Sequence, residues 1–242
     1  AAPLDVFANE NYLADFLEAP LEACRYQGRL YALPVFINGG LLFYRKDLLL
    51  KERMSPPRTL DDLVKQAKLL SKKYGLTGFV FQGAAYEGLV CDYLEYVIAH
   101  NGNLIVEPDN IVINTTENEQ ALQFMVDLIH KHQITPPPKD LLEYNETLSE
   151  MHFKAGNAAF LRTWQPFIHF SQEEPTKVRN VVDFDTIPGK EAGVFASTLG
   201  GWTLAMNTYS QHPREAWEVM KYLVSARSQD KRLQNSMDFP SR

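Results

Sequence analysis

Cysteine is scarce in this sequence, with only Cys24 and Cys91 among its 242 residues. The two cysteines lie far apart and form no CxxC pair, which excludes a zinc ribbon and a dithiol redox motif. Small, weakly polar thiols of this kind are commonly buried, so we expect two buried cysteines. The sequence leaves a disulfide between them open.

Long apolar runs are also missing. No stretch of about 18 or more apolar residues occurs, so we expect no membrane-spanning helix. No secretory signal begins at Ala1, which a mature exported protein would equally show. Ala1–Asn9 gives no clear first strand, and Met237–Arg242 ends on a Pro-Ser-Arg loop. We therefore expect the chain to be the middle portion of a longer protein.

Positive charge is not in excess. The 24 Lys and Arg residues against 30 Asp and Glu residues give a formal net charge of -6 and a pI of about 5.6. Phosphate binding needs clustered basic residues, and no basic stripe occurs, so nucleic acid is not an expected partner. A hydrophobic share of 45% is typical of a globular chain with one large domain or two small ones.

Common catalytic and cofactor motifs are absent: the sequence has no GxxxxGK[ST], no GxGxxG after a strand, no HExxH and no GxSxG. His130 and His132 would point to different sides of a helix, so we expect neither a metal nor a cofactor. We interpret Glu143, Glu146 and Glu150 as a solvated helix face. That interpretation leaves no carboxylate pair placed for glycoside hydrolysis.

Helical and strand patterns alternate along the chain, which predicts an α/β fold. Thr59 is expected to cap a helix over residues 60–74 that ends at Gly75. A second helix is expected over residues 141–153, and a hairpin over 104–114 with its turn at residues 108–110.

The stretch from residue 30 to residue 49 organises the chain. Two apolar strands, Leu30–Val35 and Leu41–Tyr44, are separated by Asn38-Gly39-Gly40, where glycine permits the backbone to turn. A second glycine break, Gly200-Gly201, precedes another apolar strand. Two such breaks are what a chain passing from one lobe to another and back would show.

Aromatic residues stand beside polar residues at several predicted strand ends. Ligands of α/β proteins bind at such ends, where aromatic faces suit the C–H faces of a sugar and polar groups suit its hydroxyls. Each residue taken alone could equally be a core or turn residue, so the hypothesis rests on the repetition. The residues concerned are Phe36 with Asn38, Gln82 with Tyr86 and Glu87, Arg162 and Gln165 with Trp164, and Trp202.

The chain resembles the family 1 extracellular solute-binding proteins of ABC transporters. The resemblance is carried in order by YQGRLYALPVFINGGLLFYRKDLL, PPRTLDDLVKQAKLL, GFVFQGAAYEGLVCDYLEYVIAHNGNLI, MHFKAGNAAFLRTW and STLGGWTLAMNTYSQHPREAWEVMKYLVS. The segment QGAAYEGLVCDYLE is similar to the trehalose/maltose-binding branch. The resemblance implies a type II, periplasmic-binding-protein-like fold of two α/β lobes, of which this chain would hold mostly the second.

On this resemblance, residues 1–37 belong to lobe I, 38–202 to lobe II and 203–242 to a return segment of lobe I. Hinges are expected at residues 38–41 and 198–203. Position 38 is often acidic in sugar-binding relatives, so Asn38 leaves the solute in question. The resemblance and the strand-end pattern together give these candidate ligand-binding residues: Phe36, Asn38, Tyr86, Glu87, Arg162, Trp164, Gly200, Gly201 and Trp202.

The function implied is that of a monomeric, non-enzymatic binding component that delivers a disaccharide such as trehalose or maltose to ABC permease subunits. The solute would lie in an aromatic-lined cleft between the lobes. A periplasmic or extracellular location follows, with or without a lipid anchor. Two alternatives remain: another polyol or a glycerol-phosphate-type solute on the same fold, or a carbohydrate-active enzyme.

Overall fold

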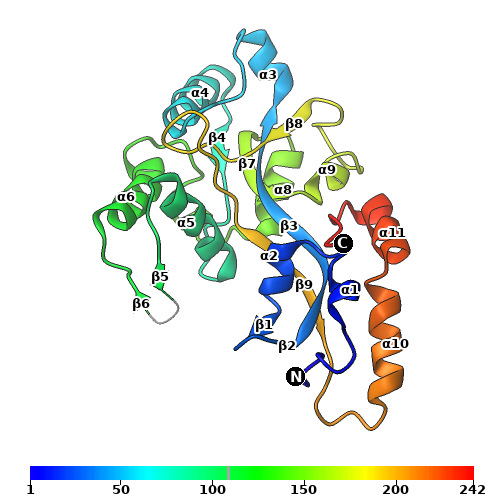
Figure 1. Cartoon of the computed structure of the whole chain (residues 1–242). Helices are drawn as coiled ribbons and strands as arrows, with labels where there is room; N and C mark the ends of the chain where they lie inside the picture. The colour runs from blue at the N-terminus through cyan, green and yellow to red at the C-terminus, as the bar shows by residue number, and fades with distance from the viewer. Residues whose placement is uncertain (108–109) are drawn as a thin grey trace. The chain divides into compact units, whose positions relative to one another are not determined.

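The computed structural model describes residues 1–107 and 110–242, which form two compact units (Figure 1). Unit 1 combines Ala1–Gly39 with Leu199–Arg242, and unit 2 is Gly40–Thr198. The lobe boundaries expected from the sequence are at 37–38 and 202–203. The units of the structure divide elsewhere, because antiparallel pairing between the strands over residues 32–39 and 199–205 extends through Gly39 and Leu199.

Unit 1 is built from both ends of the chain around an antiparallel pair of strands, β3 and β9. Its elements are α1 (Glu10–Leu13), α2 (Glu18–Glu22), β1 (Arg25–Tyr26), β2 (Arg29–Leu30), the first part of β3 (Ala32–Arg45), β9 (Leu199–Ala205), α10 (Pro213–Leu223) and α11 (Ala226–Ser236). β1 and β2 form a hairpin, in which Gln27 and Gly28 both adopt positive φ as a tight two-residue turn requires.

The core of unit 1 joins residues from the two ends of the sequence. Leu33 of β3 packs with Leu4 near one end and Trp217 of α10 near the other. Trp217 stacks on Phe7 at 5.7 Å between ring centroids. Ser241 is fully buried and donates its hydroxyl to the Pro34 carbonyl at 2.8 Å. The last residues of the chain are therefore part of the support of β3.

Unit 2 contains the rest of β3 and most of the helices. Its further elements are α3 (Lys46–Lys51), α4 (Leu60–Tyr74), β4 (Thr77–Val80), α5 (Glu87–Ala99), β5 (Ile105–Glu107), β6 (Asn110–Ile111), α6 (Thr116–His130), α7 (Pro138–Leu141), α8 (Glu146–Lys154), β7 (Ala158–Trp164), α9 (Phe167–Phe170) and β8 (Val182–Asp185).

The sheet of unit 2 has the order β4-β7-β3-β8, with β4 and β7 parallel and the other pairs antiparallel. Side chains alternate between its two faces, as the period of a strand dictates. Phe79 and Phe160 pack in a core with α4, α5 and α6, whereas Val80 and Leu161 pack in a second core with α8 and α9. Unit 2 is thus a three-layer α/β/α arrangement.

The predicted break in β3 does not exist. Residues 32–45 form one continuous strand, and neither Gly39 nor Gly40 adopts positive φ. The reason is pairing on both sides of the predicted break: β9 pairs with Ala32–Gly39, and β7 pairs with Gly40–Tyr44. Backbone hydrogen bonds to partners distant in sequence hold the glycines extended.

The predicted helix over residues 141–153 is wrong in its extent. α7 ends at Leu141, and α8 begins only at Glu146 after Asn145 caps it, accepting a hydrogen bond from the Leu148 N–H at 3.1 Å. Asn at such a position favours a helix start over a helix interior.

Predictions from local capping signals are confirmed. Thr59 caps α4 through Asp62 N–H at 3.1 Å, and Gly75 ends it in the left-handed conformation. β5 and β6 form the predicted hairpin, whose turn falls partly on residues 108–109, outside the described residues. Cys24 and Cys91 are both free thiols; Cys24 is buried and Cys91 is half-buried, so only the first matches the expectation of burial.

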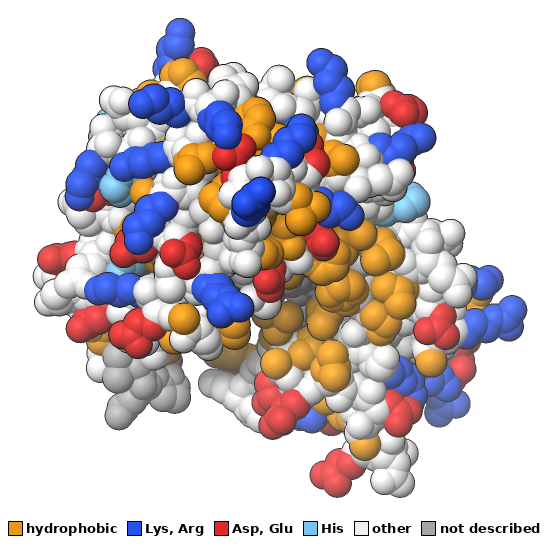
Figure 2. Space-filling view, turned by 90° about the horizontal axis from the view of Figure 1, so that it is seen from above, with side chains coloured by type: hydrophobic (Ala, Val, Ile, Leu, Met, Phe, Trp, Pro, Cys, Tyr) orange, Lys and Arg blue, Asp and Glu red, His pale blue; other side chains and the backbone are white. Residues whose placement is uncertain are grey.

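The surface carries mixed charges. Figure 2 shows Lys and Arg side chains scattered among Asp and Glu side chains over the face it presents. Side chains of the two signs are interspersed on that face, and Lys and Arg do not form a separate stripe there.

Candidate functional site

The predicted site residues of unit 2 lie where α5 begins and where β7 ends. Tyr86 immediately precedes α5, Glu87 is its first residue, and Arg162 and Trp164 belong to β7. Tyr86 is 37% exposed and Glu87 is exposed, whereas Trp164 is half-buried and Arg162 is only 1% exposed. Two accessible aromatic rings are therefore available on this unit.

One carboxylate joins these two aromatic residues. The Tyr86 hydroxyl donates a hydrogen bond to Glu146 Oε2 at 2.5 Å, and Trp164 Nε1 donates to Glu146 Oε1 at 3.1 Å. Burial and the hydrogen bond to Glu146 raise the pKa of Tyr86, so its hydroxyl remains a donor at neutral pH. Tyr86, Glu146 and Trp164 form a single group, called here the aromatic–carboxylate cluster.

The sequence interpretation of Glu146 as a solvated residue is wrong, since the side chain is half-buried and accepts two hydrogen bonds. Glu146 opens α8 directly after its Asn145 cap, where a negative charge is favourable for the helix dipole. The Asn-Glu pair marks a helix start in the sequence. Nothing local to it indicates that Tyr86 and Trp164 come to the same carboxylate.

Arg162 supports Trp164 from the interior of unit 2. Its Cζ lies 4.3 Å from the centroid of the Trp164 ring. The Arg162 guanidinium donates to Glu95 from Nε at 2.9 Å and from Nη2 at 2.5 Å. Its Nη1 donates to Gln82 Oε1 at 3.0 Å, and Asp92 Oδ1 lies 2.8 Å from Nε. The sequence predicts Arg162 as a solute contact; its burial instead favours a supporting role.

Burial also sets the ionisation of this network. It raises the pKa of Asp92 well above the ordinary value, against a smaller lowering by Arg162. Burial alone would lower the pKa of Arg162, but the carboxylates of Asp92 and Glu95 outweigh it and raise that pKa. Arg162 therefore stays charged, and its bonds to Glu95 are charge-assisted and strong.

The same network holds both crossing segments within unit 2. Glu95 Oε1 accepts the Thr198 N–H at 3.0 Å, and the Thr198 hydroxyl donates to the Cys91 carbonyl at 2.8 Å. The Ser197 hydroxyl donates to the Gly40 carbonyl at 2.8 Å. The two ends of unit 2, at Gly40 and Thr198, are thus held beside α5 by these hydrogen bonds.

The predicted site residues of unit 1 are cross-strand neighbours on β3 and β9. Phe36 lies opposite Trp202, and Asn38 opposite Gly200. Trp202 is 71% exposed, while Phe36 is half-buried. Residues directly opposite in an antiparallel pair present their side chains on the same face. The strand pair therefore displays one exposed indole ring beside Phe36.

Gly201 is needed here for its backbone. Its φ is 139°, a conformation that side-chain-bearing residues rarely adopt, and a Cβ at this position would overlap the Phe36 carbonyl oxygen. Gly201 is therefore required by the packing of unit 1, independently of any solute.

A second carboxyl group lies one helical turn beyond Glu146. Glu150 accepts a hydrogen bond from the Thr163 hydroxyl at 2.6 Å, next in sequence to Trp164. Burial raises the pKa of Glu150 to about 7, with the Glu146 charge adding to the increase and Thr163 opposing it. A group that ionises near neutral pH is therefore hydrogen-bonded to the residue that precedes Trp164.

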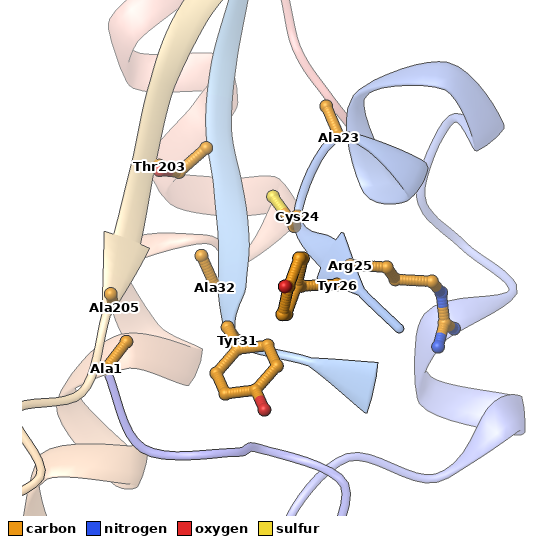
Figure 3. A pocket seen from close by; sticks show the side chains of 9 residues that line it. All are labelled: Ala1, Ala23, Cys24, Arg25, Tyr26, Tyr31, Ala32, Thr203 and Ala205. Atoms are coloured by element: carbon orange, nitrogen blue, oxygen red, sulfur yellow. The ribbon is translucent and has the colours of Figure 1, made fainter. Parts of the chain in front are cut away.

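Unit 1 also has an open hollow of about 380 Å³. Figure 3 shows that Ala32 and Ala205 lie on one side of it, with the rings of Tyr26 and Tyr31 beside them. The Arg25 side chain extends away from Ala32 and Ala205, and its Nε lies 3.0 Å from Glu22 Oε1. We assign no solute contact to this hollow, because its charged group is directed elsewhere.

Within residues 1–107 and 110–242, no group of three or more His, Cys, Asp or Glu side chains is arranged to hold a metal ion. Over the same part of the chain, no helix combines the length and apolar character that crossing a membrane requires.

Comparison with known proteins places the chain in a family. The model of the bacterial extracellular solute-binding proteins matches residues 1–230. The chain belongs to this family. A probable ABC transporter-binding protein of Deinococcus radiodurans is 36% identical over 212 residues, which cover 85% of this chain and 50% of that protein. An arabinooligosaccharide-binding protein of Bacillus subtilis is 21% identical, covering 93% of this chain and 51% of that protein.

Solved structures of the family agree in fold. Maltose-bound MalE3 of T. maritima superimposes with a TM-score of 0.92 at 37% identity, covering 100% of this chain and 62% of that one. A ribitol complex of a solute-binding protein from Agrobacterium radiobacter has a TM-score of 0.81 at 26% identity, covering 94% and 58%. The chain thus has the α/β fold of the two-lobe binding proteins, and it spans about half the length of the curated relatives it matches.

Proposed function

We propose that this chain is part of the solute-binding component of an ABC importer, and that it binds a sugar or polyol without transforming it. The observation that carries the proposal is the aromatic–carboxylate cluster of Tyr86, Glu146 and Trp164. Aromatic rings can pack on the C–H face of a sugar, while carboxylate oxygens accept from its hydroxyls. Membership of the solute-binding family supports the same function.

Unit 1 would supply a second contact surface. The exposed ring of Trp202 beside Phe36 offers the aromatic face, with Asn38 and Gly200 paired next along the strands. Glu87, exposed at the start of α5, would add a hydroxyl acceptor on unit 2. We retain these predicted contacts as part of the proposal, with Arg162 reassigned to support.

For the solute itself we propose a disaccharide such as maltose or trehalose. A maltose complex is among the similar structures, at 37% identity. A linear polyol is the second candidate, because a ribitol complex is also similar, at 26% identity. A glycerol-phosphate-type solute is disfavoured, because Arg162 is buried and already paired with carboxylates.

The proposed setting follows from the family. The family match supports delivery to permease subunits and a periplasmic or extracellular location. A monomeric state completes the proposal. The test is calorimetric titration of the full-length protein with maltose, trehalose, ribitol and mannitol. Saturable heat with at least one solute, and no turnover of it, is expected. No heat with any of them would refute the proposed class, and hydrolysis of maltose would favour an enzyme.

A further inference from the structure

We infer that Glu146 determines the charge specificity of this site, so that it accepts uncharged hydroxyl-rich solutes and rejects anionic ones. This inference rests on the proposed function, because it concerns the solute held by the aromatic–carboxylate cluster. It assigns a solute-selecting role to a residue whose sequence context indicates only the start of a helix.

The acceptor capacity of Glu146 is the first argument. An ionised carboxylate offers about four acceptor positions. Tyr86 takes one on Oε2 and Trp164 takes one on Oε1, so further lone pairs remain on each oxygen. The side chain is half-buried, which leaves it reachable from solvent. A solute hydroxyl can donate to these lone pairs, whereas a solute carboxylate or phosphate group only adds like charge.

The surrounding charges point in the same direction. Glu87, exposed at the start of α5 directly after Tyr86, is a further carboxylate on this unit. Arg162, on β7, is buried between the carboxylates of Asp92 and Glu95 of α5. Its positive charge is therefore already balanced, and it cannot offset Glu146 for an incoming anion.

The other cation on these elements faces elsewhere. Lys154, at the end of α8, is 6% exposed, and its Nζ lies 3.7 Å from the centroid of the Phe170 ring. An ammonium group seated on an aromatic face is held by the ring quadrupole and is directed toward α9. The cluster therefore presents an acidic surface to a solute.

The chemistry of the Glu146 carboxylate distinguishes a role in solute specificity from a purely structural role. A purely structural tie between Tyr86 and Trp164 would work with any acceptor of the right shape. The carboxylate differs from an amide in two respects: it accepts from both rings at once, and it carries charge. Glu146→Gln keeps the size of the side chain, removes the charge and offers only one acceptor oxygen.

The experiment measures affinities by calorimetry for two pairs of a neutral and an anionic solute: maltose with maltobionate, and ribitol with ribonate. The full-length wild-type protein is expected to prefer the neutral member of each pair. In Glu146→Gln, the neutral-to-anionic affinity ratio should fall by about tenfold or more, since like charges a few ångströms apart repel strongly at low effective dielectric. Added salt should lower the wild-type ratio only partly, because half-buried charges are incompletely screened.

Two variants serve as controls. Glu143→Gln makes the same charge change at an exposed residue of the preceding loop and should leave the ratio unchanged. Glu146→Asp keeps the charge, so it should retain the preference for neutral solutes even if its affinity drops. This second variant also tests the inference if Glu146→Gln fails to fold.

A spectroscopic signal reports the positioning role separately. The indole N–H resonance of Trp164, assigned by its loss in Trp164→Phe, should shift in Glu146→Gln and remain in place in Glu143→Gln. An unchanged affinity ratio in Glu146→Gln would overturn the inference, whatever the resonance does. Wild-type protein that binds the anions as tightly as the neutral solutes would also overturn it while leaving solute binding intact. Absence of binding to these four compounds, and to trehalose and mannitol as well, would refute the proposed function together with the inference.

Discussion

Gly40 lies so close to Glu95 that a side chain at residue 40 would overlap the Glu95 carboxylate. The same carboxylate accepts hydrogen bonds from Arg162 and from the Thr198 backbone. The point at which β3 enters unit 2 is therefore fixed by a buried ionic network, with glycine serving close approach instead of a turn.

Gly40→Ala should destabilise unit 2 by about 1–3 kcal/mol, the usual cost of overpacking a buried site. The added Cβ would displace the Glu95 carboxylate and the Arg162 guanidinium together. Urea unfolding followed by circular dichroism measures the loss. Gly28→Asn is the control, because that residue lies in a turn with open space around it and Asn tolerates positive φ. Equal stability of Gly40→Ala and wild type would contradict the close approach.

Arg162→Met should destabilise the protein by about 3–5 kcal/mol, because removing one partner leaves buried carboxylates without compensation. Asp92 and Glu95 are both within the interior, at 1% and 2% exposed. Arg179→Met, which breaks an exposed pair with Glu174 at 3.0 Å, should cost at most about 1 kcal/mol. Denaturant unfolding compares the two variants, and similar costs would argue against the buried network as the dominant support.

Trp164→Ala and Trp202→Ala should each weaken solute binding on the order of tenfold, because each removes an aromatic face worth about 1 kcal/mol or more. Calorimetry with maltose measures the change. Tyr209→Ala is the matched control, since Tyr209 is 86% exposed and lies beyond the end of β9. Unchanged affinity in both tryptophan variants would remove these residues from the site.

Glu150 should make stability depend on pH between about 4.5 and 7. Its pKa is raised to about 7 in the folded protein from an ordinary 4.5, so the folded state binds the proton more tightly. The contribution of Glu150 to the free energy of unfolding therefore falls as pH rises through that window, and the full loss is reached above a pH of about 7. Asp92, whose pKa is also raised, contributes in the same sense.

Glu150→Gln isolates this effect, because it removes the titrating group while Asp92 remains. Relative to wild type, the variant should gain on the order of 2 kcal/mol in unfolding free energy at pH 8 and nearly nothing at pH 4.5. Urea unfolding at the two pH values measures the difference. A gain of equal size at both pH values would show that Glu150 does not titrate in this window.

Elements whose signals are local could be predicted from the sequence. Thr59 with Asp62, Gly75 and the turn at Gln27-Gly28 each act within a few residues, so the caps of α4 and the first hairpin follow from neighbouring side chains alone. The apolar alternation of helices and strands likewise predicts the α/β class that the family comparison confirms.

Features that depend on partners distant in the sequence could not be predicted and are seen only in the folded chain. β3 is continuous because β7 and β9 pair with it, which local glycine content cannot indicate. Arg162 is internal because Asp92 and Glu95 on α5 meet it, and Glu146 becomes a ligand-site candidate because Tyr86 and Trp164 converge on its carboxylate. Each of these outcomes is set by contacts between residues far apart in the chain, and the identity of one side chain does not predict which distant residue it contacts.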